Sequence, residues 1–431
     1  MKSAISPIHK PLTISLVLPF AGIILFGLVL VMLIPALASA SKTEMIDGAT
    51  HIKNGDKPTH GIETWQLEEL WTAGGLDDES VLFGIITQVE IGDDNNIYLL
   101  DNQLSQVQVY SPEGELLRTL GGPGEGPGEV TNPAAMTVLP NGNIGLVKAM
   151  PGKLIRLDSE GTPLDDFIPA GYEPSEGGIS LAIRCYGANN NLIFGGMKLV
   201  FDAETSTQTR DYHIRCYAED QTQISEYYTK NVLWDFRNFV MKEIDTDFPW
   251  QRLDVADDGS VYMSPERYGY DIHVFQPDGT LAKVISREYQ SYERDQAMKD
   301  LVDRAFQRQM ESPQMPPNSS YEAEAYEPDI ANLRVAANGD IWVHNSRQQW
   351  ASEPGQFNYD VFNSDGEFIK EVRIECGGSA KDDRLFFARD DRIYKVSGFL
   401  AAAISAQGLG GEEDEEDEEA EVMAITAYRR K

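Results

Sequence analysis

The chain has 431 residues, of which 42% are hydrophobic and 10% aromatic, and its 36 basic and 69 acidic residues give a net charge of −33. This charge repels phosphate backbones, so a nucleic-acid partner is excluded. The three cysteines, Cys185, Cys216 and Cys376, are too few for a disulfide framework, and we expect buried free thiols.

The amino-terminal residues 1–40 have the pattern of an export signal. Lys2 and Lys10 precede an apolar run over residues 12–38, which ends in Ala-Ser-Ala, a small-residue cleavage pattern. The run is also long enough to span a bilayer of about 30 Å. A cleaved signal peptide and an uncleaved anchor are therefore both open. In either case we expect the rest of the chain to be exported to the periplasm or the cell exterior, with membrane contact only through this segment if it is retained.

Residues 62–431 are predicted to form one repetitive β domain after a polar linker at residues 41–61. Six copies of a motif place an apolar residue directly after a tight turn rich in Asn, Asp and Gly: Ile97, Ile144, Leu192, Val261, Ile341 and Ile393. These turn residues tolerate the positive φ angles of hairpin turns. A second turn follows most copies, so each unit is predicted to contain four antiparallel strands, A to D. Such repeated units indicate an all-β, six-bladed propeller.

The sixth copy is short, because only one convincing strand follows Ile393, in residues 422–428. A strand from residues 64–71 would complete the last blade and close the ring, which removes the open edges of the sheet. Leu70 also allows a short helix at this position.

The crossing between the first two units carries a resemblance. Residues 121–130 read Gly-Gly-Pro-Gly-Glu-Gly-Pro-Gly-Glu-Val, with Pro133 after them and Asn-Ile-Tyr-Leu-Leu-Asp at 96–101. This sequence resembles exported bacterial six-bladed β-propeller proteins with NHL-type repeats. The resemblance implies the fold and export, and it implies no activity.

Two insertions and an acidic run interrupt the predicted propeller. The insertion at 222–250 is rich in aromatic residues, and the insertion at 286–330 begins with a predicted helix from Tyr289 to Met310 that prolines end. Residues 412–419 are eight consecutive carboxylates, which we expect to form a solvated loop rather than a cation site.

The long connections of the predicted blades, including B–C loops at residues 196–210 and 346–357, lie at the end that carries the B–C loops and the D–A crossings. Variable loops on a rigid scaffold are where binding sites occur, so we expect the site on this face. Four arginines enter strand A close to it: Arg184, Arg252, Arg334 and Arg384. They either hold an anionic group of a ligand or pair with carboxylates that tie the blades together. If they hold a ligand, Arg252→Glu with Arg384→Glu abolishes binding without unfolding the protein.

Asp101 and Asn345 occupy equivalent positions at the end of strand B. Propeller lactonases and lyases, which share this blade number, place metal ligands at such positions, so calcium at Asp101 and Asn345 is an alternative. The other blades offer Lys148, Gly196, Pro265 and Ser397 there, a set too poor in ligands to predict a metal site or cofactor. We also predict no catalytic residue, since the sequence has no Gly-x-Ser-x-Gly motif and no closely spaced histidine pair.

These patterns favour a binding or scaffold module that recognises a protein or small-molecule ligand. Its predicted binding residues are the four arginines with Asp101 and Asn345. The alternative is a metal-dependent propeller hydrolase or lyase that acts on a lactone, ester or glycan.

Overall fold

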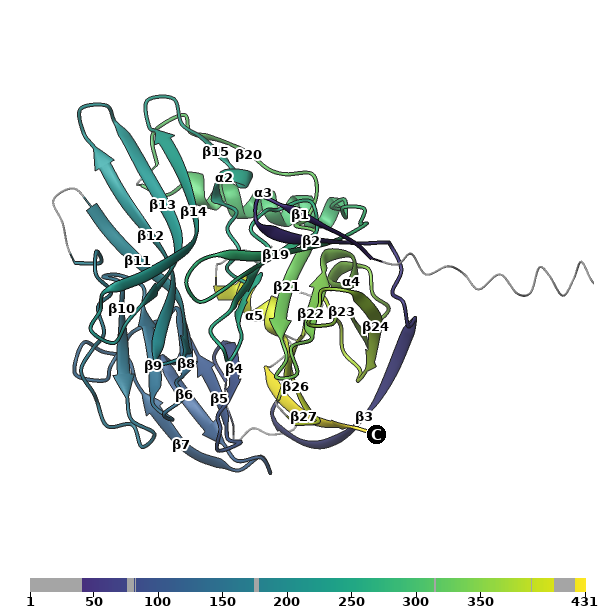
Figure 1. Cartoon of the computed structure of the whole chain (residues 1–431). Coiled ribbons are helices and arrows are strands. Elements are labelled where there is room, and N and C mark those ends of the chain that lie inside the picture. The colour runs from purple at the N-terminus through teal and green to yellow at the C-terminus, as the bar shows by residue number, and fades with distance from the viewer. Residues whose placement is uncertain are drawn as a thin grey trace, which may run out of the picture.

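The structure is a computed structural model that describes residues 41–75, 81, 83–173, 178–313, 315–388, 390–406 and 423–431. The predicted export segment, residues 1–40, and the acidic run at 412–419 lie outside the described residues. Among the described helices, none is long and apolar enough to cross a membrane. The strands form sheets around a common centre (Figure 1), and together they are the six-bladed propeller that the sequence predicts.

The first three blades follow one another along the chain. Blade 1 contains β4 (Ile86–Ile91), β5 (Ile97–Asp101), β6 (Gln106–Tyr110) and β7 (Leu116–Gly121). Blade 2 contains β8 (Ala135–Val138), β9 (Ile144–Lys148) and β10 (Lys153–Leu157). Blade 3 contains β11 (Gly178–Ala188), β12 (Asn191–Asp202), β13 (Thr207–Tyr217) and β14 (Gln223–Asp235).

The last three blades complete the ring. Blade 4 contains β16 (Leu253–Val255), β17 (Val261–Met263), β18 (Asp271–Phe275) and β19 (Leu281–Arg287). Blade 5 contains β21 (Ile330–Val335), β22 (Ile341–Asn345), β23 (Gln356–Phe362) and β24 (Phe368–Glu375), with α4 (Ser346–Trp350) in its B–C connection. Blade 6 contains β25 (Arg384–Phe387), β26 (Arg392–Ser397) and β27 (Ala424–Arg430), with α5 (Phe399–Ala406) after β26.

Blade 2 departs from the four-stranded prediction. Its fourth strand is reduced to two isolated bridges, which join Leu157 to Pro163 and Leu154 to Phe167. Proline has no N–H to give to a ladder, so Pro163 weakens regular pairing at this outer position.

Three amino-terminal strands form a belt along the outer edges of blades 4, 5 and 6. They are β1 (Lys42–Ile46), β2 (Ala49–Asn54) and β3 (Ile62–Gly74). β2 pairs parallel with β19, and the first part of β3 pairs parallel with β24. The second part of β3 pairs antiparallel with β27 as the outer strand of blade 6, which is the predicted closure. The linker prediction for residues 41–61 is therefore wrong: this segment covers exposed strand edges.

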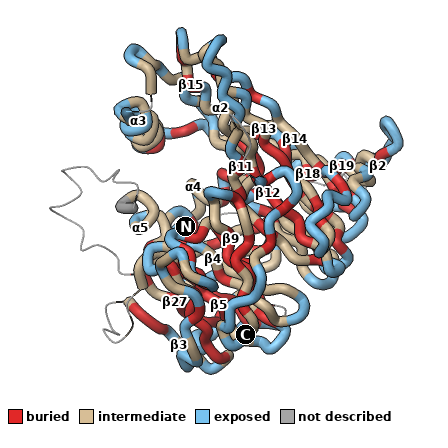
Figure 2. Tube along the Cα trace, turned by 90° about the vertical axis from the view of Figure 1, so that its left-hand side faces the viewer, coloured by how far each residue is buried: buried red, intermediate tan, exposed pale blue. Residues whose placement is uncertain are grey.

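Polar side chains on the inner strands join neighbouring blades around the centre. Gln88 on β4 bonds both backbone groups of Met136 on β8, with lengths of 2.8 and 2.9 Å. Glu90 accepts the N–H of Val138 at 2.6 Å, and Asp254 on β16 accepts that of Val335 on β21 at 2.7 Å. Each innermost strand is an edge strand, so these bonds satisfy backbone groups that the sheet leaves unpaired. Most strands of the blades contain buried hydrophobic residues, and Figure 2 shows long buried segments, in red, along the sheets.

Candidate functional site

The longest connections gather at the B–C and D–A end of blades 3 and 4. We use the name lobe for the halves of β12 to β14 nearest the β12–β13 turn, together with residues 236–250 and 288–329. It contains β15 (Val240–Lys242), α2 (Glu243–Thr246), α3 (Gln296–Met310) and β20 (Ser320–Glu322), with β15 and β20 paired in parallel. Figure 1 shows these elements above the ring beside the hairpins of blade 3.

The lobe corrects three boundaries that the sequence predicts. Residues 196–210 are not a B–C loop, because β12 and β13 continue as one long hairpin. Residues 223–235 of the first insertion form β14, the outer strand of blade 3. α3 begins at Gln296, later than predicted, because Asp295 caps it by accepting the N–H of Met298 at 2.9 Å. Tyr289 packs instead on Tyr270 of blade 4, with ring centroids 5.0 Å apart.

A buried ion-pair network fastens the lobe to blade 4. It consists of three arginines and three carboxylates: Arg252, Arg267, Arg294, Glu243, Asp247 and Glu327. Asp247 takes both terminal nitrogens of Arg252, at 2.6 and 3.1 Å, and Glu243 takes both of Arg294, at 2.6 and 2.7 Å. Burial acts to raise the pKa of Glu243, but Arg294 and Arg267 outweigh it, so this pKa is lowered. The three positive and three negative charges balance.

Arg252, one of the four predicted binding arginines, is a member of this network, so its charge is already paired within the protein. Its side chain is 4% exposed, and its Nε donates to the carbonyl of Ser264 at 3.2 Å. With Asp247 on the terminal nitrogens, the guanidinium is fully engaged within the protein. Arg252 therefore supports the lobe.

Arg184 and Arg334 bond backbone carbonyls of neighbouring blades. Arg184 donates to Ala134 before blade 2, at 3.0 Å, and to Trp250 before blade 4, at 3.3 Å. Arg334 of blade 5 donates to the carbonyl of Phe387 in blade 6 at 2.6 Å and lies over the ring of that residue. Both side chains connect consecutive blades.

Arg384 bonds its own local backbone. Its guanidinium donates to the carbonyls of Ala380, Lys381 and Asp383 at 2.8 to 3.4 Å, and it lies 4.9 Å from the centroid of Phe399. Burial lowers its pKa. Of the four arginines, only Arg252 pairs with a carboxylate, as the second interpretation of the sequence expects, whereas Arg184 and Arg334 connect blades through backbone carbonyls. The contacts of the four give no shared anion site.

Asp101 and Asn345 are likewise engaged by their own surroundings. Asp101 is fully buried and accepts three backbone N–H groups, from Gly84, Ile85 and Leu104, at 2.7 to 3.1 Å. The side-chain oxygen of Asn345 accepts the N–H of Gln348 at 3.0 Å and so caps α4. The hydrogen-bond partners of the two side chains are different residues, and the described residues contain no group of three or more His, Cys, Asp or Glu suited to a metal.

A second buried network, absent from the sequence predictions, joins blades 4 and 5. Asp360 on β23 is fully buried and accepts hydrogen bonds from Asn345 at 3.0 Å and Gln348 at 2.9 Å. It also accepts from the hydroxyl of Tyr270 and pairs with Arg287 at 3.2 Å. Both of these residues belong to blade 4, so this carboxylate holds the two blades together.

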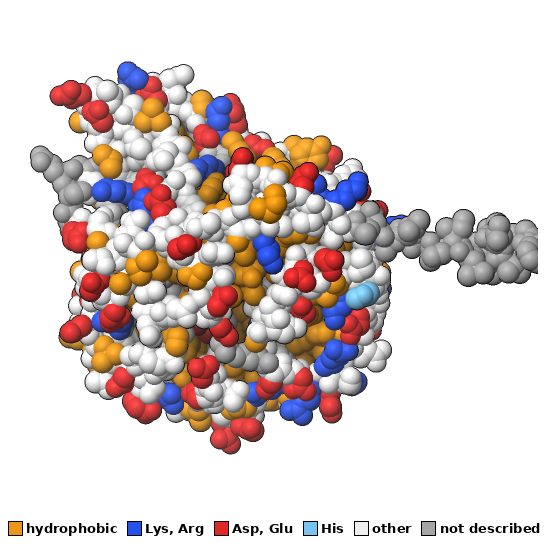
Figure 3. All heavy atoms as spheres, viewed as in Figure 1, with side chains coloured by type: hydrophobic (Ala, Val, Ile, Leu, Met, Phe, Trp, Pro, Cys, Tyr) orange, Lys and Arg blue, Asp and Glu red, His pale blue; other side chains and the backbone are white. Residues whose placement is uncertain are grey.

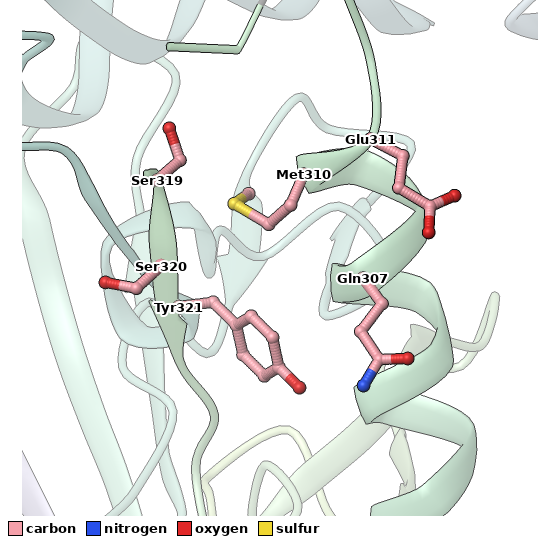
Figure 4. A pocket seen from close by; sticks show the side chains of 6 residues that line it. All are labelled: Gln307, Met310, Glu311, Ser319, Ser320 and Tyr321. Atoms are coloured by element: carbon pink, nitrogen blue, oxygen red, sulfur yellow. The ribbon is translucent and has the colours of Figure 1, made fainter. Parts of the chain in front are cut away.

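Two cavities flank the segment that follows α3 in the lobe. The first, of about 430 Å³, lies between α3 and β20 and is lined by Gln307, Met310, Glu311, Ser319, Ser320 and Tyr321 (Figure 4). Tyr321 stacks on Phe306 and donates its hydroxyl to Asp303 at 3.2 Å, so it is part of the packing of α3. Its lining is mixed, with Met310 and the ring of Tyr321 beside polar and charged side chains.

The second cavity, of about 480 Å³, is the candidate site, and we call it the cleft. It is lined by Phe201, Ser206, Gln208, Arg210, Trp234, Phe236, Arg237, Met315 and Pro316. These residues come from the blade 3 hairpin, the crossing after β14 and the insertion after α3, so the cleft lies on the B–C and D–A face. The rings of Phe236 and Phe239 pack on Trp234, with centroids 6.1 and 4.7 Å away. Apolar walls with a few polar groups are typical of ligand sites.

Two arginines line the cleft, and they differ in whether their guanidinium is paired with a carboxylate. The guanidinium of Arg210 lies over the ring of Trp234, 3.0 Å from the centroid, and its Nε donates to Gln208 at 2.9 Å. Arg237 is exposed and is held by both oxygens of Asp235, at 2.6 and 2.8 Å. Within the described part of the chain, no carboxylate lies within ion-pair distance of Arg210.

Sequence reasoning predicted the face that carries this cleft but not the residues that line it. The aromatic density of residues 222–250 was the available signal, because Trp234 and Phe236 both line the cleft. Gln208 and Arg210 carried no signal: they lie in a stretch without a motif, and only the length of the β12–β13 hairpin brings them to the cleft. Acidic side chains are spread over the whole face in Figure 3 and do not mark a site either.

Comparisons with known proteins concern the fold. Residues 77–244 match the sequence profile of a family described as a 6-bladed β-propeller. None of the curated proteins matches the sequence. The family match agrees with the ring that the sheet topology shows.

Three solved structures illustrate the similarity. A protein of Bacteroides fragilis named as an exported protein is 12% identical with a TM-score of 0.44, over 86% of this chain and 99% of that one. The calcium-binding protein regucalcin from Agrobacterium tumefaciens is 11% identical with a TM-score of 0.40, over 85% and 95%. Virginiamycin B lyase from Staphylococcus aureus is 8% identical with a TM-score of 0.38, over 83% and 98%.

Proposed function

We propose that the protein is an exported binding module whose ligand occupies the cleft of the lobe. The observation that carries this proposal is a cavity of about 480 Å³ with aromatic walls and polar groups on the loop-rich face. Cavities of about 300–1,000 Å³ with this kind of lining hold small molecules. The volume therefore favours a small ligand over the alternative of a protein partner.

Export is supported by the sequence alone. The apolar run over residues 12–38 and the Ala-Ser-Ala that ends it are the pattern of a secretory signal. A binding module in the periplasm or outside the cell would meet ligands that enter from the surroundings. Retention of residues 1–40 would tether the cleft to a membrane, and cleavage would release it.

The metal-dependent hydrolase or lyase has no comparable support. It requires oxygen or nitrogen ligands that face a common point and are free to bind an ion. The carboxylate of Asp101 instead accepts three backbone N–H groups, and the side-chain oxygen of Asn345 caps a helix. The binding module remains the better interpretation.

Two neighbouring positions on β13 allow a matched test of the cleft. Gln208 lines the cavity, whereas Thr209 is exposed on the opposite face of the same strand. Gln208→Trp should fill the cleft, and Thr209→Trp adds the same side chain outside it. A library of small organic molecules would be screened against residues 41–431 by ligand-observed NMR.

We expect molecules that bind the wild-type protein to lose binding in Gln208→Trp and to keep it in Thr209→Trp. Melting temperatures of both variants close to the wild-type value would show that the fold is intact. Molecules that bind Gln208→Trp as well as they bind the wild-type protein would place the site elsewhere, and a library without binders would overturn the proposal.

A further inference from the structure

We propose that the ligand of the cleft is a small organic carboxylate with a flat apolar body, and that Arg210 binds its charge. This inference rests on the proposed binding function and adds the chemical class of the ligand. It follows from the difference between the two arginines of the cleft and from the aromatic side chains beside them.

Arg237 is neutralised by its neighbour two residues before it. Asp235 takes its Nε and one terminal nitrogen in a bidentate pair, so a ligand would have to compete with an existing carboxylate. Arg210 has a different partner. Its Nε is bonded to the neutral amide of Gln208, and its terminal nitrogens are bonded to no carboxylate among the described residues. A ligand carboxylate in the cleft would accept hydrogen bonds from the terminal nitrogens of Arg210 in a bidentate pair.

The charge of Arg210 is partly withdrawn from water. The residue is half-buried, with Trp234 beneath it, and burial lowers its pKa, although the Tyr212 hydroxyl acts to raise it. Keeping a cation half-buried without a counter-ion costs free energy. The chain has 69 acidic residues, yet no described one pairs with Arg210. The position is therefore suited to an anion that comes from outside the protein.

The walls of the cleft indicate what the carboxylate is attached to. Phe201 is 49% exposed and its ring centroid lies 6.1 Å from that of Phe236, whereas Trp234 is only 4% exposed beneath Arg210. Met315 lines the cavity from the insertion. Aromatic faces favour flat apolar groups, and a thioether adapts to their shape. An aromatic carboxylate combines both requirements, because its ring would contact Phe201, Phe236 and Met315 while its charge reaches Arg210.

Two isosteric probes separate charge from shape. 2-Naphthoate carries the carboxylate, and 2-naphthamide has the same outline without the charge. Their dissociation constants would be measured by calorimetry with the wild-type protein, Arg210→Gln, Arg237→Gln and the filled-cleft variant Gln208→Trp. Arg237→Gln is the matched control, since it removes a charge from the same cavity that Asp235 already neutralises.

We expect the wild-type protein to bind naphthoate at least about tenfold more tightly than naphthamide, because a charge-assisted bidentate pair with Arg210 contributes that much binding free energy. Arg210→Gln should abolish this preference, Arg237→Gln should keep it, and Gln208→Trp should bind neither probe. Equal affinities for the two probes in the wild-type protein, both lost in Gln208→Trp, would overturn the carboxylate inference and leave the binding function standing. Failure of both probes to bind would count against both.

Discussion

The arginines around the ring and Arg210 in the lobe differ in their partners. Around the ring, Arg184, Arg334 and Arg384 give their hydrogen bonds to backbone carbonyls, and Arg252 pairs with a buried carboxylate. In the lobe, Arg210 lies beside a cavity, and its partners among the described residues are an amide, a tyrosine hydroxyl and an aromatic ring rather than a carboxylate. The position of an arginine near a channel mouth is therefore a weaker guide to binding than the state of its hydrogen bonds.

The physical reason for the difference is the edge of the blade. An innermost strand leaves backbone groups without a strand partner, and buried polar groups must be paired. Long polar side chains from the next blade meet this need, so the ring uses its arginines for its own cohesion. The β12–β13 hairpin extends past the ring, where its strands pair with each other and with β11 and β14. A polar side chain such as Arg210 is not required there to satisfy a neighbouring blade.

Replacing an arginine by glutamate in each region should give the largest contrast. Arg252→Glu would place a carboxylate against Asp247 inside the buried network, and breaking a buried pair costs about 3–5 kcal/mol. Arg210→Glu loses mainly the contact with Trp234, worth about 1 kcal/mol. Urea midpoints of the two variants and the wild-type protein would measure the difference. Equal destabilisation by the two changes would show that Arg210 is as structural as Arg252.

This expectation revises the sequence-based prediction for Arg252→Glu with Arg384→Glu. The sequence places both residues on strand A and predicts intact folding, because it does not reveal their partners. Asp247, the partner of Arg252, lies in a crossing whose path depends on α2 and β15 rather than on a local pattern. The structure predicts that this double variant loses stability.

The sequence was informative wherever the structure is set by neighbours along the chain. Asn95 and Asn189 have φ angles of 62° and 49° in the turns before strand B, and the strands that begin at Ile97 and Ile341 follow such turns as predicted. The belt could not be predicted in this way. Asn54 at the end of β2 bonds the carbonyls of Ser286 and Gly366, residues far away in the chain. Its strand is mostly polar and does not alternate regularly, so only its distant partners identify it.

A smaller effect is expected from Glu90 on β4, whose titration should make the stability of the ring depend on pH. Burial raises the pKa of Glu90 to about 7 from an ordinary value of 4.5, and nearby Asp254 adds to the rise. Between these two values the folded protein keeps a proton that the unfolded chain releases, so the free energy of unfolding falls as the pH rises through this window. The full loss is at most about 3 kcal/mol, and it is complete above the folded pKa.

Glu90→Gln should remove this contribution, because the amide stays neutral and its oxygen still accepts the N–H of Val138. Urea midpoints of the wild-type protein and the variant, compared at about pH 5 and about pH 8, would isolate the effect of this one group. The variant should gain stability relative to the wild-type protein at the higher pH. A difference that is the same at both pH values would mean that Glu90 titrates normally.

The smallest expected effect is that of metal ions on the ring. The oxygen atoms of Asp101 and Asn345 already accept N–H groups, so calcium or zinc would have to displace buried hydrogen bonds to bind there. We therefore expect no change in the melting temperature of residues 41–431 with either ion or with a chelator. An ion that bound only the folded state would add about 2.7 kcal/mol at about 100 times its dissociation constant, which a thermal scan would detect. A variant without residues 412–419 separates the two places where calcium could act: a calcium-dependent rise that survives this deletion would assign the ion to the folded ring and restore the hydrolase or lyase, whereas a rise that disappears would belong to the acidic run.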